Sequence, residues 1–293
     1  MLAFDFAKPS DVPALKRLWK SVFGDTNRYI EQYFNSLFPL IRVAVARTER
    51  GRPVSMLSML PVSFRADTTD YPGHYIYAAA THRRYEGRGI MTGLLTFACD
   101  DAAERGECFS SLIPASASLF GFYNKRGYQT VFYRDILQAA SAEKRPKPPE
   151  WTISRMSRDD FLRLRQVFVE KLPVCMMQDP LLYPYIYEEL LESGTDILLV
   201  QGNGKSGYVV CYAIDSFLAV KETSFSKQEL SAVLPLLEER MHCHGAAAVF
   251  PPLGTAEAGG KCKRTAYGML RPLAGRIPAE IMEKNAYMGL LMD

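Results

Sequence analysis

The stretch 75–91 joins an apolar strand to a helix through a glycine-containing turn, an arrangement that suits anion binding. The first N–H groups of a helix have no intrahelical partner, and the helix dipole adds partial positive charge there. Such a terminus binds phosphate readily, and Gly87 and Gly89 would let the backbone approach an anion closely. Three basic residues surround the turn: Arg83, Arg84 and Arg88. We therefore expect a phosphate group to bind here, although two glycines also suit a plain strand–helix connection.

Two other phosphate-binding motifs fit this turn less well. The P-loop pattern G-x-x-x-x-G-K-[ST] is absent from the sequence. Gly87, Gly89 and Gly93 have the spacing G-x-G-x-x-x-G, which is one residue longer than the dinucleotide-binding fingerprint. The turn alone therefore does not identify its ligand.

A second motif follows about 30 residues downstream, and the two motifs together indicate a ligand for the turn. It reads Phe122-Tyr123-Asn124-Lys125-Arg126-Gly127-Tyr128, and the turn itself reads Glu86-Gly87-Arg88-Gly89-Ile90-Met91. Together they resemble the GCN5-related N-acetyltransferase (GNAT) family, whose pyrophosphate loop [QR]-x-x-G-x-[GA] is followed by F-Y-x-x-x-G-[FY]. Two positions depart from the pattern: Glu86 replaces Arg or Gln, and Met91 replaces Gly or Ala. Large apolar residues at the second position also occur in a tandem branch of the family, the enhanced-intracellular-survival-like acetyltransferases. The two-copy layout of this chain resembles that branch.

The resemblance implies that the chain binds acetyl-coenzyme A as acyl donor and that an amine attacks the thioester directly. The pantetheine arm would meet backbone polar groups at the end of the preceding strand. The residues expected to bind the cofactor are Ala79, Ala80, Thr81, Glu86, Gly87, Arg88, Gly89, Ile90, Met91 and Ser116. The departing thiolate needs a proton, and we expect Tyr123 to donate it; the alternative is that Tyr123 only packs in the core.

The attacking amine needs a base, and the sequence offers no clear internal candidate. In the tandem branch the C-terminal carboxylate reaches the active site of the first domain. We therefore expect Asp293 to take this role, although the apolar tail before it also suits an ordinary docked strand. The acceptor groove of the family lies over the first two helices, where this chain carries Trp19, Tyr29, Tyr33, Phe34 and Phe38; aromatic residues at this spacing more often form the core.

These motifs need elements to position them, and the 293-residue chain suggests two domains. A proline-rich, charged stretch at 142–150 divides it near the middle, so we expect domains at 1–140 and 151–293. Strands are expected at 2–8, 41–47, 54–64, 74–81, 108–113 and 128–137, with helices near 10–23, 27–37, 90–105 and 119–126. The second half repeats this order of elements. Its matching strand–helix junction at 220–227 contains no glycine, so we expect a degenerate copy.

The fold class expected is therefore α/β (α+β), with two tandem GNAT-like domains, each a mixed and mostly antiparallel sheet flanked by helices. The first would bind acetyl-CoA, and the second would shape the structure or the substrate site. We expect Gly254 to Gly260 and the following Lys261-Cys262-Lys263-Arg264 to form a mobile surface loop.

Composition sets the remaining expectations. A net charge of +3 is too small to argue for a nucleic-acid groove. No apolar run is long enough to span a membrane, and no signal peptide is evident, so we expect a cytoplasmic protein with no nucleic-acid or membrane partner. Six scattered cysteines fit a reduced compartment. The His242-Cys243-His244 run lacks a further ligand pair, so no metal is expected.

Three function hypotheses remain open at this point. The first is an N-acetyltransferase acting on a primary amine of a small molecule or a peptide. The second is a non-catalytic acyl-CoA-binding or sensing protein, and the third is an interaction scaffold that keeps only the fold. The sequence leaves the acceptor, the acyl chain length and homo-oligomer formation open.

Overall fold

The computed structural model describes residues 2–66, 68–139, 151–252 and 262–289. The first half of the chain has the element order that its hydrophobic pattern predicts. A glycine in the left-handed conformation, Gly24, ends the first helix, and Thr26 caps the second by accepting from the Tyr29 N–H. Its main elements are β1 (Ala3–Phe6), α1 (Val12–Phe23), α2 (Asn27–Gln32), β2 (Arg42–Arg47), β3 (Pro53–Ala66), β4 (Thr69–Thr81), α3 (Ile90–Glu104), β5 (Phe109–Leu112), α4 (Ala117–Asn124) and β6 (Gln129–Ala139).

The second half repeats much of this order and then adds elements that pair with the first half. Ser157 caps its first helix by accepting from the Asp160 N–H. Its elements are β7 (Thr152–Arg155), α5 (Arg158–Glu170), β8 (Val174–Gln178), α6 (Tyr183–Glu192), β9 (Asp196–Gly202), β10 (Lys205–Ile214), β11 (Phe217–Thr223), α7 (Lys227–Arg240), β12 (Ala246–Phe250), β13 (Cys262–Pro272), α8 (Ala279–Met282) and β14 (Tyr287–Met288).

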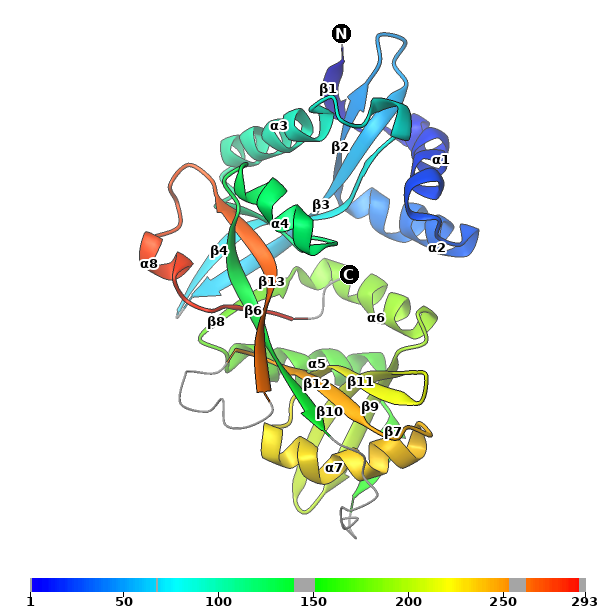
Figure 1. Ribbon diagram of the computed structural model, residues 1–293, viewed down its shortest axis with the longest axis vertical. Helices are drawn as coiled ribbons and strands as arrows, with labels where there is room; N and C mark the ends of the chain where they lie inside the picture. Colours follow the sequence, from blue (N-terminus) through cyan, green and yellow to red (C-terminus); the bar gives the residue numbers. More distant parts are fainter. Residues whose placement is uncertain (1, 67, 140–150, 253–261, 290–293) are drawn as a thin grey trace.

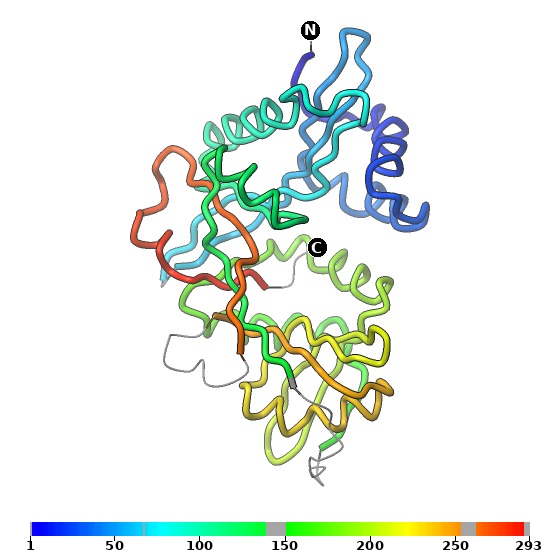
Figure 2. Tube along the Cα trace, viewed as in Figure 1, coloured from blue at the N-terminus to red at the C-terminus, as the bar shows by residue number. Residues whose placement is uncertain are grey.

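The two halves exchange strands within one sheet. Along that sheet the order is β1-β2-β3-β4-β5-β13-β6-β12-β11-β10-β9-β7. The late strand β13 therefore lies between β5 and β6 of the first half, and β6 lies between β13 and β12 of the second half. Figure 1 shows β6 and β13 crossing together from the upper lobe to the lower one, and the trace in Figure 2 follows the same pair. Each half is completed by a strand of the other.

The largest hydrophobic core also joins the halves. One cluster of buried residues contains Trp19 and Tyr33 from the first half and Phe161 and Tyr208 from the second. Separate clusters include apolar residues of α3 in the first half and of α7 in the second. The helices α1, α2, α5 and α6 thus share the central core, whereas α3 and α7 each cover a core of their own half (Figure 1).

Two segments of the second half differ from the sequence-based prediction. The expected loop after Gly254 is wrong from Cys262 onward, because Cys262 to Arg264 begin β13; residues 253–261 lie outside the described residues. The strand β8 was not expected at all. In β13, Arg264 pairs with Asp135 of β6, with Arg264 Nε 2.9 Å from Asp135 Oδ1. This cross-strand partner explains why the charged segment 262–264 forms a strand.

Candidate functional site

The strands β4 and β5 diverge near the middle of the sheet. They pair in parallel from Gly73 and Phe109 to Ile76 and Leu112, and the pairing ends there. Beyond Tyr77 the strand β4 also bulges, since both Ala78 and Ala79 fall between successive pairs with β3, and Ala78 has a φ of 50°. A bulge leaves an extra residue unpaired in the ladder. Backbone polar groups are thus released from β4 where the two strands separate.

A cavity of about 910 Å³ occupies this divergence. Its walls come from α1, α2, β4, the loop after β5 and α4 in the first half, and from α6, β6 and β13. Ala78, Ala79, Ser116 and Tyr123 line it. Its size lies near the top of the ~300–1,000 Å³ range that holds small ligands in proteins.

The N-terminus of α3 is open to a ligand. Its N-cap, Gly89, has a φ of 73° and no side chain to accept from the first N–H groups. Gly87 also has a φ of 73°, and a Cβ placed on either glycine would meet no atom within 4 Å. Both glycines, like Glu86 and Arg88, are exposed. The exposed amides and the left-handed turn suit an anion.

The corresponding helix of the second half is closed. Ser226 and Glu229 form a capping box at the N-terminus of α7: the Ser226 hydroxyl accepts from the Glu229 N–H, and the Glu229 carboxylate accepts from the Ser226 N–H at 2.9 Å. Lys205 pairs with the same carboxylate. The pKa of Glu229 is lowered to about 2, chiefly by Lys205 and then by Ser226. The protein's own carboxylate thus occupies the place that a phosphate would need.

Tyr123 lies on α4, 9 % exposed, and lines the cavity. Its ring packs against Tyr128 at 5.8 Å and Phe122 at 5.1 Å between centroids. Burial raises the pKa of its hydroxyl, so the phenol stays protonated at neutral pH. Tyr123 thus packs in the core of the first half and also lines the cavity, and its role as proton donor stays a prediction.

Ala80 and Thr81 lie at the end of the same strand, β4. Ala80 is buried, and its carbonyl accepts from the Ser55 hydroxyl at 2.9 Å. The Ser55 hydroxyl also lies 2.9 Å from that of Thr81. Ile90 is buried and Met91 half-buried at the start of α3. Asp293 lies outside the described residues.

The expected aromatic wall divides between the core and the cavity. Tyr33 and Phe34 are buried, whereas Trp19 and Tyr29 also line the cavity. The Tyr29 and Tyr77 hydroxyls lie 2.6 Å apart, and the Trp19 indole donates to Asp25 at 2.6 Å. Burial raises the pKa of Tyr29 to about 12. The aromatic residues are thus partly core and partly cavity lining, and their role as an acceptor groove stays a prediction.

Sequence reasoning missed three residues that the second half and β6 bring to the cavity. They are Glu189 on α6, Arg134 on β6 and Tyr267 on β13. The Arg134 guanidinium lies 4.2 Å from the centre of the Tyr267 ring. No local pattern could have identified them, because strand exchange and the docking of α6 bring them to the site.

The described residues hold no group of three or more His, Cys, Asp or Glu side chains placed to bind a metal ion. Across the same residues, no helix is both long and apolar enough to cross a membrane.

Comparison with known proteins agrees with this geometry. Residues 3–131 match the model of the acetyltransferase (GNAT) domain. No curated protein matches the chain.

Several solved structures share the fold over nearly the whole chain. A probable N-acyltransferase from Enterococcus faecalis is 16% identical with a TM-score of 0.75, and the match covers 93% of this chain and 73% of that one. A GCN5-related N-acetyltransferase from Anabaena variabilis is 13% identical with a TM-score of 0.72, and the match covers 92% of this chain and 72% of that one. Eis1 from Mycobacterium abscessus is 14% identical with a TM-score of 0.64, and the match covers 93% of this chain and 73% of that one. The predicted tandem α/β fold is confirmed; the domain boundary near residue 140 stays a prediction.

Proposed function

We propose that the chain transfers an acetyl group from acetyl-CoA to a primary amine of a small molecule or peptide, because residues 3–131 match the model of the acetyltransferase (GNAT) domain. The observation that carries the proposal is the cavity of about 910 Å³ at the divergence of β4 and β5. It combines the bulged backbone of β4, the Tyr123 hydroxyl and walls from both halves.

The proposed cofactor position runs from the turn before α3 to the bulge of β4. The pyrophosphate binds the exposed N–H groups at Gly87, Gly89 and the first turn of α3. The pantetheine arm follows the end of β4 past Thr81 and Ala79. The acetyl carbonyl then reaches the bulge, where a free backbone N–H stabilises the oxyanion that forms during attack.

In the proposed reaction the neutral amine attacks the thioester carbonyl carbon, and the bond to sulfur breaks. Tyr123 donates its phenolic proton to the leaving CoA thiolate. A protonated phenol in a buried setting suits this step, since burial raises the pKa of Tyr123. The amine gives up its proton to a base, for which the C-terminal carboxylate of Asp293 stays our prediction.

We propose that Glu189 selects cationic acceptors. It belongs to the second half, yet it lines the cavity with Tyr29 and Asp25. A carboxylate at this wall attracts an ammonium ion and holds the amine-bearing end of the acceptor near the β4 bulge. The degenerate half would then shape the substrate site of the first half.

The Glu189 proposal is tested by steady-state kinetics of Glu189→Gln. We expect the KM for a cationic amine to rise about tenfold, because a hydrogen bond to a charged group is lost. The KM for acetyl-CoA is expected to stay unchanged. An equal rise of both values, or no change in either, would contradict the role in acceptor selection.

Release of CoA in the presence of a panel of amines tests the activity itself. We expect at least one primary amine to accelerate release above hydrolysis. Acetyl-CoA should also raise the melting temperature of the protein. A raised melting temperature without turnover of any amine would favour the acyl-CoA-binding alternative, and no shift at all would favour a scaffold.

A further inference from the structure

A small pocket of about 120 Å³ adjoins the segment that leads from β4 to α3. Its walls come from α1, from the start of β3 and from His82, the residue that follows β4. These segments meet at the upper end of the molecule in Figure 1. The turn proposed for the cofactor's pyrophosphate begins a few residues later, at Glu86. The volume is well below the ~300 Å³ at the lower end for drug-sized ligands, so the pocket suits one small group.

Three basic side chains line this pocket, and each comes from a different segment. Arg17 lies on α1, Arg52 lies in the turn between β2 and β3, and His82 follows β4. The other described lining residues carry no charge: Ala14, Leu18, Ser21 and Pro53. Like charges gathered at one small pocket repel one another, and a bound anion would relieve that repulsion.

The two arginine side chains are not neutralised by the part of the chain that the structure describes. Neither Arg17 nor Arg52 forms an ion pair or a side-chain hydrogen bond there. The acidic residue at the start of α1, Asp11, is held instead by Arg47, whose two terminal nitrogens each lie 2.7 Å from an Asp11 carboxylate oxygen. Both guanidinium groups at the pocket can therefore bind an external anion.

The hydrogen bonding of His82 adds a third donor. Its Nδ1 accepts from the Arg84 N–H at 3.2 Å and caps the short helix Arg83–Tyr85. A neutral imidazole that accepts through Nδ1 carries its proton on Nε2, and that N–H can donate. The pocket thus offers a planar fork from each arginine and an imidazole N–H, which together fit the oxygens of a phosphate group.

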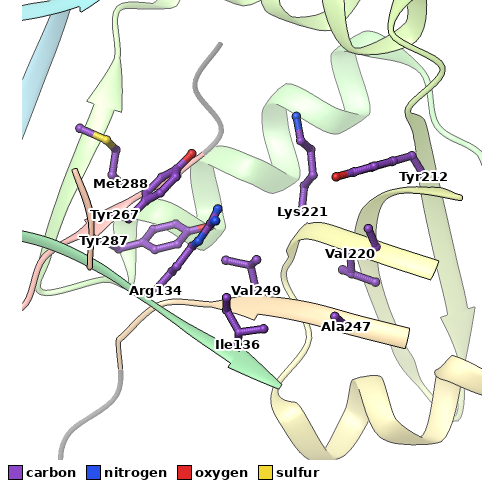
Figure 3. A pocket seen from close by; sticks show the side chains of 12 residues that line it. Arg134, Ile136, Tyr212, Val220, Lys221, Ala247, Val249, Tyr267, Tyr287 and Met288 are labelled. Carbon is purple, nitrogen blue, oxygen red and sulfur yellow. The ribbon is translucent and has the colours of Figure 1, made fainter. Parts of the chain in front are cut away.

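The cavity at the divergence of β11 and β12 differs in this respect. It measures about 260 Å³ and lies where the pairing of these strands ends, and Arg134 and Lys221 line it (Figure 3). Glu222 lies directly beside it, since Glu222 Oε2 accepts from the hydroxyl of the lining residue Tyr287 at 3.1 Å. Lys221 also has a partner of its own. A carboxylate of the protein thus accompanies the cations there, whereas the described lining of the pocket beside α1 contains none.

We propose that the pocket lined by Arg17, Arg52 and His82 binds a phosphate monoester. The phosphate has two sources that share this chemistry. One is the 3′-phosphate of CoA, and this source rests on the proposed function, because the pocket adjoins the turn proposed for the pyrophosphate. The other is a phosphate group on a separate ligand, and this source does not depend on acetyl transfer.

Titration calorimetry at constant ionic strength with CoA, 3′-dephospho-CoA and inorganic phosphate tests the proposal and separates the two sources. If the ligand is the 3′-phosphate, the wild type should bind CoA about tenfold more tightly than 3′-dephospho-CoA, because hydrogen bonds between charged groups are added. Arg17→Gln and Arg52→Gln should each remove most of that difference and leave the affinity for 3′-dephospho-CoA unchanged. If the source is a separate ligand, the two coenzymes should bind equally, and inorganic phosphate should bind the wild type about tenfold more tightly than either variant.

Arg155→Gln serves as the matched control, because Arg155 is also exposed, lies on β7 and does not line the pocket. It should match the wild type in all three titrations. An equal loss of affinity in the control would overturn the proposal, since binding would then reflect net charge. Circular dichroism of each variant separates lost binding from lost folding.

Two further results would also overturn the proposal. One is a preference for CoA over 3′-dephospho-CoA that survives in both pocket variants. The other is equal binding of the two coenzymes together with inorganic phosphate that binds the wild type and the variants alike, or binds none of them. Absence of binding by either coenzyme would contradict the proposed function instead, and the phosphate titration would still decide whether the pocket binds an anion.

Discussion

At the scale of single residues, the assignment that most needs a test is Tyr123. It packs in the core of the first half and lines the large cavity, and burial raises the pKa of its hydroxyl. A group with this environment can hold a proton at neutral pH and give it to a thiolate. The same residue would have a purely structural role if no substrate reached it.

Tyr123→Phe separates these roles. The substitution keeps the ring that packs on Phe122 and Tyr128 and removes only the hydroxyl. We expect kcat to fall about 10²-fold, as is typical for loss of a general acid, with the melting temperature nearly unchanged. Unchanged kcat with intact folding would limit Tyr123 to packing.

At the scale of elements, the turn before α3 is tested by a pair of glycine substitutions. Gly89 and Gly51 have φ values of 73° and 75°, and a Cβ on either meets no atom within 4 Å. Gly89→Ala and Gly51→Ala should therefore each lower the free energy of unfolding by about 1 kcal/mol through backbone strain. Only Gly89→Ala should also weaken acetyl-CoA binding, about tenfold, because it disturbs the amides that bind the pyrophosphate.

Gly51 is the matched control because it lies in the hairpin between β2 and β3, where its N–H donates to the Thr48 carbonyl. Calorimetry with acetyl-CoA gives the two affinities, and urea unfolding gives the two stabilities. Equal affinities of the two variants for acetyl-CoA would contradict a role of the turn in binding the cofactor.

The cap of α7 predicts a pH dependence of stability. Glu229 has a pKa lowered to about 2, chiefly by Lys205, against a usual value near 4.5. Its contribution is therefore fully present above pH 4.5 and is lost as the pH falls toward 2. We expect Glu229→Gln to lower the free energy of unfolding at pH 7, with the difference from wild type shrinking below pH 4.5. A difference that does not change with pH would contradict the ionic origin of the cap.

The elements themselves could largely be predicted from the sequence. Periodic apolar residues, capping side chains and glycines placed α1 and α3 within a few residues, because these signals are local. The strand β13 could not be predicted, since its charged start is stabilised by Asp135 on a strand more than 120 residues away. The cavity residues Glu189 and Arg134 were missed for the same reason. The two cofactor motifs are short local patterns that the sequence shows directly, and their role in binding acetyl-CoA stays a prediction.

At the scale of the whole molecule, strand exchange between the halves predicts cooperative unfolding. β13 completes the first half and β6 completes the second, and one core cluster spans both. Neither half can therefore open without exposing the edge of the other. We expect a single unfolding transition in urea for the full chain.

The two tryptophans allow each half to be followed separately. Trp19 lies in the central core, and Trp151 packs on Phe225 in the second half. The Trp151→Phe variant keeps Trp19 as its fluorescent probe, and the Trp19→Phe variant keeps Trp151. Circular dichroism follows the secondary structure of the whole chain in each variant. We expect the two probes to give coincident midpoints within each variant. A fluorescence midpoint at a lower urea concentration than the circular-dichroism midpoint would show that the halves unfold independently.

The central claim is that one acetyl-CoA site exists and that it lies in the first half, at the open N-terminus of α3. A crystal structure of the protein with bound acetyl-CoA tests this most directly. The account predicts a pyrophosphate on the backbone N–H groups of Gly87 and Gly89 and an acetyl group beside the bulge at Ala78 and Ala79. A cofactor bound at the divergence of β11 and β12, or anywhere away from the turn before α3, would contradict it.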